Sequence, residues 1–102
     1  MNMKKAEIFQ GKKIEISEMI LNEVDNKLVL SWKICLENTV FGMVFSNVSR
    51  LRIGEVSAPI EIQGFEIIDH SQNGWDKDSL YEIRDFEDDR VSFFCERFEM
   101  YD

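Results

Sequence analysis

Alternation of large apolar and smaller or polar residues is the feature that most restricts what this chain can fold into. Large apolar side chains occupy every second position from Leu28 to Leu36. The same period recurs at Ile14–Ile16, Phe41–Phe45, Tyr81–Ile83 and Val91–Cys95. Successive side chains of a strand point to opposite faces, so this pattern is typical of half-buried antiparallel strands. Alanine occurs only twice among the 102 residues, which also favours strands over helices.

Turn-forming residues separate these segments. Asp25-Asn26 indicates a hairpin, and Glu37–Thr39, Ser57–Pro59, Asn73-Gly74 and Glu87–Asp89 mark further breaks. The alternation changes phase beside Gly64, which predicts a β-bulge there. We therefore predict one all-β domain spanning residues 1–102, an antiparallel β-sandwich or partly open barrel of about seven or eight strands.

One segment fits two secondary structures. Residues 14–24 could form an amphipathic helix with Ile16, Met19, Ile20 and Val24 on its apolar face. The alternation at Ile14–Ile16 and the Asp25-Asn26 turn favour a strand, but the sequence leaves the helix open.

The net charge of −8 lies entirely in the C-terminal third. Residues 1–65 contain eight acidic and eight basic residues, whereas residues 66–102 contain twelve acidic and four basic ones. Such a field repels nucleic acid and anionic membranes and attracts cationic proteins, although plain solubility explains it too. No apolar run approaches the roughly 20 residues of a membrane span, and no secretory signal precedes the domain, so we expect a cytoplasmic protein.

No combination of residues predicts a catalytic, metal or cofactor site. His70 is the only histidine, and its neighbours Asp69 and Ser71 do not by themselves make a triad, so we expect a solvated loop histidine. The loop starting at Asp69 matches the first half of a calcium loop, but Leu80 stands where its bidentate glutamate belongs. Cys35 and Cys95 are expected to be buried, reduced thiols.

The candidate binding surface is the end of the fold that holds the loop around Trp75. The strand that follows the turn at 87–89 should run back toward this end. A tryptophan among carboxylates is either a plug on the core or an exposed anchor for a partner. The predicted interface comprises Asp69, Trp75, Asp76, Asp78 and Glu99.

The C-terminal half resembles a known group of proteins. The resemblance rests on Asn47–Ile53, Gly64–Asp69, Gly74-Trp75, Tyr81–Asp85 and Val91–Cys95. These segments are similar to small acidic bacterial β-sheet proteins associated with immunity to polymorphic toxins. The resemblance implies a cytoplasmic antidote that docks on a toxin domain, and it implies no functional residue.

The leading functional hypothesis is a non-catalytic binding protein that occludes a basic toxin or effector domain. The alternatives are a small enzyme that uses carboxylates or calcium, and a structural module that pairs through an open strand edge. Residues 39–54 carry few charges before Arg50, so an edge there would favour a homodimer.

Overall fold

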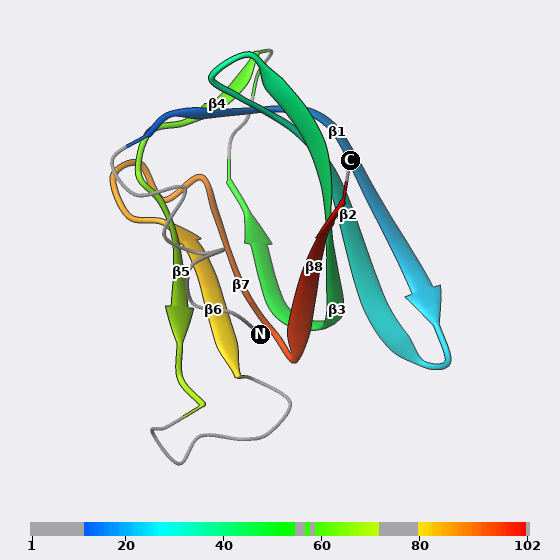
Figure 1. Ribbon diagram of the computed structural model, residues 1–102. Coiled ribbons are helices and arrows are strands. Elements are labelled where there is room, and N and C mark those ends of the chain that lie inside the picture. Colours follow the sequence, from blue (N-terminus) through cyan, green and yellow to red (C-terminus); the bar gives the residue numbers. More distant parts are fainter. Residues whose placement is uncertain (1–11, 55–56, 58, 72–79, 102) are drawn as a thin grey trace.

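The computed structural model describes residues 12–54, 57, 59–71 and 80–101, and within these ranges every regular element is a strand (Figure 1). The all-β prediction is confirmed, and residues 14–24 form a strand rather than a helix. In the described ranges, no helix has the length and apolar character needed to cross a membrane. The strands are β1 (Ile14–Val24), β2 (Lys27–Leu36), β3 (Thr39–Ile53), β4 (Ile60–Ile62), β5 (Phe65–Asp69), β6 (Tyr81–Asp85), β7 (Val91–Cys95) and β8 (Arg97–Tyr101).

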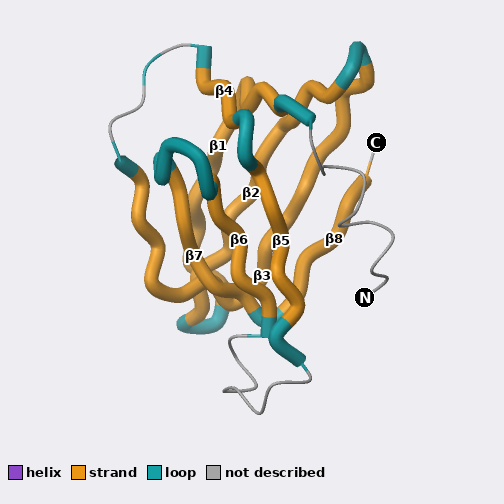
Figure 2. The backbone as a smooth tube through the Cα atoms, turned by 90° about the vertical axis from the view of Figure 1, so that its left-hand side faces the viewer, coloured by secondary structure: helices purple, strands orange, loops and turns teal. Residues whose placement is uncertain are grey.

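The eight antiparallel strands form one sheet that curls over on itself. Its order is β4-β1-β2-β3-β7-β6-β5, and β8 pairs with β3 beside this path. β4 and β5 stand at opposite ends of the order, yet only Gln63 and Gly64 separate them in the chain. The sheet must therefore curve until its two ends approach. The result is two layers, with β5, β6 and β7 facing β1, β2 and β3 (Figures 1 and 2).

A sharp bend in β3 joins the two layers. Its first part pairs with β2 and β8, and Ser49–Ile53 pairs with β7. The register shifts once opposite Leu28 and Val29 and again between Ser49 and Arg52. Asn47 and Arg50, at these two shifts, have φ values of 56° and 53°. Two β-bulges within four residues explain the bend, because a bulge kinks a strand and increases its twist.

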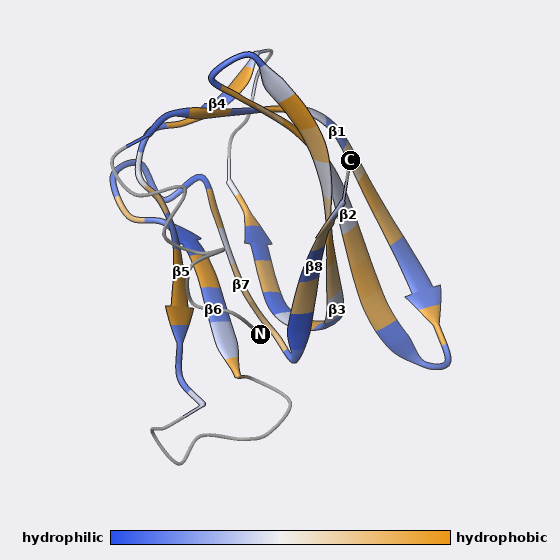
Figure 3. Cartoon of the chain, in the orientation of Figure 1, coloured by the Kyte–Doolittle hydropathy of each residue, from blue (hydrophilic) through white to orange (hydrophobic). Residues whose placement is uncertain are grey.

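The core lies between the layers and follows the predicted alternation. Trp32 of β2 contacts Phe65 of β5 and Phe93 of β7, with ring centroids 5.8 and 5.7 Å apart. Phe45 of β3 contacts Phe93 edge to face, with centroids 4.9 Å apart. Figure 3 shows the matching hydrophobic and hydrophilic bands along the strands. Buried aromatic rings from both layers therefore hold the sheet in its curled form.

Two tight turns have the backbone that two-residue hairpins require. Asp25 and Asn26 connect β1 to β2 with φ values of 53° and 65°. Glu37 and Asn38 connect β2 to β3 with φ values of 49° and 70°. Positive φ at both central residues matches the right-handed twist of the flanking strands. The predicted Asp25-Asn26 hairpin is therefore confirmed.

One local prediction was wrong, and the condition for one alternative is not met. Gly64 is not a bulge within a strand, because the chain leaves β4 there and begins β5 at the other end of the sheet. A Cβ atom on Gly64 would lie 2.9 Å from the backbone nitrogen of Glu87, so the close approach of that turn requires a glycine. β3, within residues 39–54, is not an open edge. It pairs with β2 on one side and with β7 and β8 on the other.

Candidate functional site

The structure places the predicted interface residues in separate regions. Trp75, Asp76 and Asp78 lie outside the described residues. Asp69 ends β5, opposite Tyr81 of β6. Glu99 is exposed on β8, opposite Val44 of β3. Asp69 and Glu99 thus belong to different layers.

The bend at Glu96 explains this separation. β7 does return toward the end that holds Asp69, since Cys95 pairs with Tyr81. The chain then bends at Glu96 and continues as β8 along the first part of β3. Glu99 consequently lies beside β3 in the layer of β1 and β2, and its side chain is on the face away from the core. The structure therefore does not join Asp69 and Glu99 in one surface.

Much of the acidic C-terminal segment has partners within the fold. Nine of its acidic residues are described, and the side chains of six of them make internal polar contacts. The remaining three, Glu87, Asp88 and Glu99, are exposed. The net charge therefore overstates the acidic surface that is open to a partner. The six contacts are Glu66 with Arg84, Asp69 with Ser71, Glu82 with His70, Asp85 with the backbone of its turn, Asp89 with Arg52, and Glu96 with Asn47.

His70 is not the solvated loop residue that we predicted. Its Nε2 atom lies 2.9 Å from Oε1 of Glu82, and only 12% of its side chain is exposed. Its ring also stacks on Phe94, with centroids 6.4 Å apart. The His70 N–H donates to the Leu80 carbonyl at 2.7 Å, so the pairing of β5 with β6 continues one residue beyond Asp69.

The sequence Asp69-His70-Ser71 forms a turn rather than a triad. The Ser71 backbone N–H donates to Oδ1 of Asp69 at 2.8 Å. Hydrogen bonds from the Ser71 side chain and backbone lower the pKa of Asp69. His70 contacts Glu82 instead of Ser71. This arrangement fixes the end of β5 and activates no nucleophile.

Both cysteines are free thiols. Cys95 is fully buried between the layers, and burial raises its pKa to about 12. Cys35 is half-buried, opposite Glu15 of β1 and Val40 of β3. The predicted burial applies in full only to Cys95.

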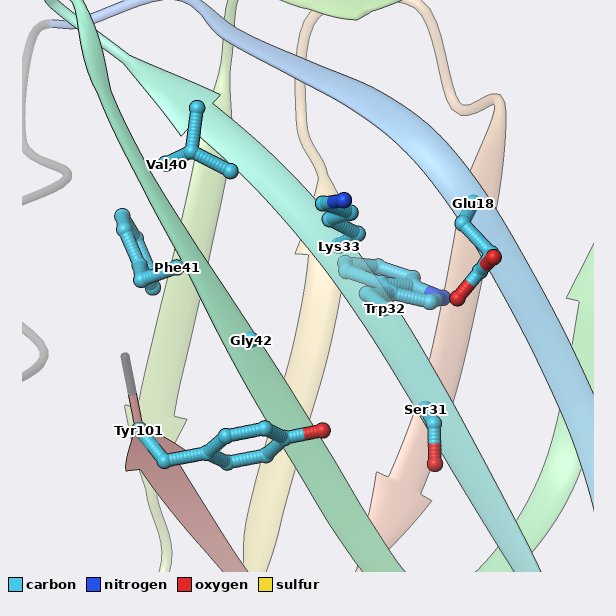
Figure 4. Close-up of a pocket in the computed structure, with 8 residues that line it drawn as sticks. All are labelled: Glu18, Ser31, Trp32, Lys33, Val40, Phe41, Gly42 and Tyr101. Carbon is cyan, nitrogen blue, oxygen red and sulfur yellow. The ribbon is translucent and has the colours of Figure 1, made fainter.

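A groove crosses the outer face of the β1–β2–β3–β8 layer. The strand registers align one residue from each strand in a single row: Glu18 opposite Lys33, Lys33 opposite Gly42, and Gly42 opposite Tyr101. The hollow has a volume of about 240 Å³ (Figure 4). We call it the Gly42 groove. It is lined by Glu18, Ser31, Trp32, Lys33, Val40, Phe41, Gly42 and Tyr101.

Gly42 makes room for the aromatic ring at one end of the groove. A Cβ atom on Gly42 would lie 2.6 Å from Cζ of Tyr101, so the tyrosine ring rests directly over the glycine. Tyr101 nevertheless remains 52% exposed. Figure 4 shows its ring extending across β3 toward β2. The glycine thus lets an aromatic side chain lie flat on the sheet while its other face stays open to a ligand.

One carboxylate lies at each end of the row. Glu18 ends the row on β1, and Glu99 lies two residues before Tyr101 on the same face of β8. Both are exposed, whereas Lys33 supplies one positive charge in the middle of the row. Two exposed apolar residues, Val40 and Ile20, lie on the same face on opposite sides of this row and are 53% and 43% exposed. An exposed aromatic ring with Glu99 on the same face of its strand is suited to a cationic side chain.

A buried polar atom lies beneath the groove. Nε1 of Trp32 is shielded from solvent and has no hydrogen-bond partner among the described residues. The indole is held by its contacts with Phe45, Phe65 and Phe93. The floor of the groove is therefore rigid, since three rings from both layers fix it.

Sequence reasoning missed the groove although one signal for it was present. The signal is Gly42 within a strand that otherwise carries large side chains, since a glycine there often marks a close approach. The partner that approaches, Tyr101, lies 59 residues away in the chain, and only the register of β3 with β8 brings the two together.

No group of histidine, cysteine or acidic side chains in the described ranges could hold a metal ion, and the calcium-like loop falls largely outside them. Comparison with protein-family models, with curated proteins and with solved structures found no match.

Proposed function

We propose that this chain is a non-catalytic binding protein whose Gly42 groove accepts a basic side chain from a protein partner. The observation that carries the proposal is the exposed Tyr101 ring, laid over Gly42 with Glu18 and Glu99 on the same face. An arginine or lysine placed on the ring would gain a cation–π contact. Its charge would also be met by Glu99, which lies on the same face of β8 as Tyr101.

Lys33 defines how such a ligand would have to bind. It lies between Glu18 and Gly42 in the row, so the groove is not uniformly negative. A cation would be favoured at the β8 end, near Tyr101 and Glu99. A carboxylate or backbone carbonyl of the partner could be met by Lys33. The groove therefore favours a polypeptide with adjacent acceptor and basic groups over an isolated cation.

The resemblance to immunity proteins suggests the class of partner. A toxin or effector domain that acts on an anionic substrate carries exposed arginine and lysine side chains. Docking the groove on those side chains would cover them, and binding alone would block the partner. Such an antidote needs no catalytic residue of its own.

The proposal is tested by binding to the polypeptide encoded by the adjacent gene, measured at low and high salt. We expect binding that weakens as salt rises, because charge pairs at a surface are screened. Tyr101→Ala should weaken it at least tenfold. Phe86→Ala is the control, since Phe86 is an equally exposed aromatic residue, 59% against 52%, in the β6–β7 turn. Equal binding by Tyr101→Ala and the wild type, or binding without salt dependence, would refute the proposal.

A further inference from the structure

Most of one edge of β1 is unpaired among the strands that the structure describes. β2 pairs with it as far as Val24, whereas β4 pairs only with Ile14–Ile16. No described strand lies on the other side of Ser17–Val24. This segment and β2 form a hairpin that extends beyond the β5–β6–β7 layer (Figure 1). Among the described residues, Ser17–Val24 therefore forms an eight-residue strand edge outside the core.

The backbone of this edge is ready to pair with another strand. In a two-residue hairpin the pair flanking the turn, here Val24 and Lys27, is hydrogen-bonded, and bonded and non-bonded pairs then alternate. Met19, Leu21 and Glu23 fall at the non-bonded positions. Their N–H and C=O groups point away from β2, toward the open edge.

Side chains along the edge are more apolar than is usual for an exposed strand. Ile20, Leu21 and Val24 are 43%, 49% and 52% exposed. Open edges normally carry charges that discourage pairing, and here only Glu18 and Glu23 could do so. An edge with a central apolar segment and a carboxylate toward each end favours some pairing registers over others.

We propose that the occupant of this edge is a second copy of the chain, paired antiparallel through β1 about a twofold axis at Ile20. This register places Ile20 opposite its own copy and Met19 opposite Leu21. It places Glu18 opposite Asn22 and Glu23 opposite Ser17, so no carboxylate faces another. The neighbouring register, centred on Leu21, would place Glu23 opposite Met19 and Glu18 opposite Val24.

The charge of the hairpin supports a partner identical to itself. Residues 17–33 contain three acidic and two basic side chains, a net charge of −1, whereas the whole chain carries −8. Two copies can thus approach through the hairpins with little repulsion. A twofold axis perpendicular to the sheet keeps both outer faces on one side, so a dimer would present two Gly42 grooves in the same direction.

The paired segment is short, so we expect a weak dimer that depends on concentration. Sedimentation velocity of the full chain, from low micromolar to near-millimolar protein, should show a reversible shift from monomer to dimer. Ile20→Lys and Ile20→Glu should each remain monomeric, because each places like charges together at the axis. Mixing these two variants should restore the dimer, because lysine then faces glutamate.

A control variant separates the edge from general surface hydrophobicity. Val40→Lys alters an equally exposed apolar residue on β3, 53% against 43%, away from the edge, and should leave dimerisation unchanged. The proposal is overturned if the wild type stays monomeric at the highest concentration. It is also overturned if the mixed Ile20 variants fail to pair, or if Val40→Lys abolishes the dimer as Ile20→Lys does.

Discussion

The side-chain amide of Asn47 donates a hydrogen bond to Oε1 of Glu96, with 3.3 Å between the two atoms. Asn47 lies at the first bulge of β3, and Glu96 lies between β7 and β8. The Glu96 backbone N–H also donates to the Ser46 carbonyl at 3.0 Å. β3 and the segment that joins β7 to β8 thus bend at the same place. The Asn47–Glu96 hydrogen bond connects them where each passes from one layer to the other.

Substitution of Asn47 should therefore weaken the fold. Asn47→Ala loses the hydrogen bond, and alanine tolerates the φ of 56° less well than asparagine does. The left-handed backbone costs about 1–2 kcal/mol for an ordinary residue with a side chain. Asn47→Gly removes the strain but also lacks the hydrogen bond, which contributes about 1 kcal/mol. Urea unfolding should rank the wild type above Asn47→Gly and Asn47→Ala last. Equal stability of Asn47→Ala and the wild type would show that the bend does not depend on this residue.

The β6–β7 turn depends on the buried carboxylate of Asp85. Only 1% of Asp85 is exposed, and its oxygens accept hydrogen bonds from the backbone N–H groups of Glu87, Asp88 and Arg90. Asp85→Ala leaves these donors without their acceptor and should cost about 3 kcal/mol of unfolding free energy.

Two further variants test this role. Asp85→Asn keeps one oxygen and should lie between Asp85→Ala and the wild type. Asp88→Ala removes an exposed carboxylate of the same turn and should change stability by less than about 0.5 kcal/mol. Similar losses for Asp88→Ala and Asp85→Ala would contradict this account.

The strands and turns could be predicted from the sequence because they depend on neighbouring residues. The alternation at Leu28–Leu36 and the Asp25-Asn26 turn are local signals, and both predictions are confirmed. The bend of β3 was missed because Asn47 and Arg50 carry no strong sequence signal for positive φ within an apolar strand. Because the prediction did not include that bend, it assigned Glu99 to the end of the fold that holds Asp69. The pairing between strands far apart in the chain decides which layer a strand joins. No local sequence pattern contains that pairing.

Gly42→Ala should close the groove without unfolding the protein. Its Cβ would meet the Tyr101 ring, which is the movable end of a side chain near the end of β8, so the ring can shift. We expect a change in stability of less than about 1 kcal/mol and a clear loss of affinity for the basic partner.

Gly54→Ala is the control for this experiment. The nearest atom to a Cβ there is the Arg90 carbonyl oxygen at 3.6 Å, an ordinary contact. Its stability and its affinity should both equal those of the wild type. If Gly42→Ala binds as well as Gly54→Ala, the groove is not the binding surface.

The thiol of Cys95 should make the fold sensitive to alkaline pH. Burial raises its pKa from 9.0 to about 12, so the unfolded chain loses this proton at a lower pH than the folded chain. The stability that the fold gains from keeping this thiol protonated is fully present below pH 9. It is lost as pH rises toward 12, at about 1.4 kcal/mol per pH unit. Cys95→Val removes this titration, so its unfolding free energy should decline less steeply over the same range. Tyr81, whose pKa is also raised, chiefly by burial, remains in both proteins. The charge of Cys95 is the smallest of the causes of that shift, so most of the Tyr81 contribution is common to the two proteins. Parallel declines for the two proteins would show that the Cys95 thiol ionises as readily in the fold as outside it.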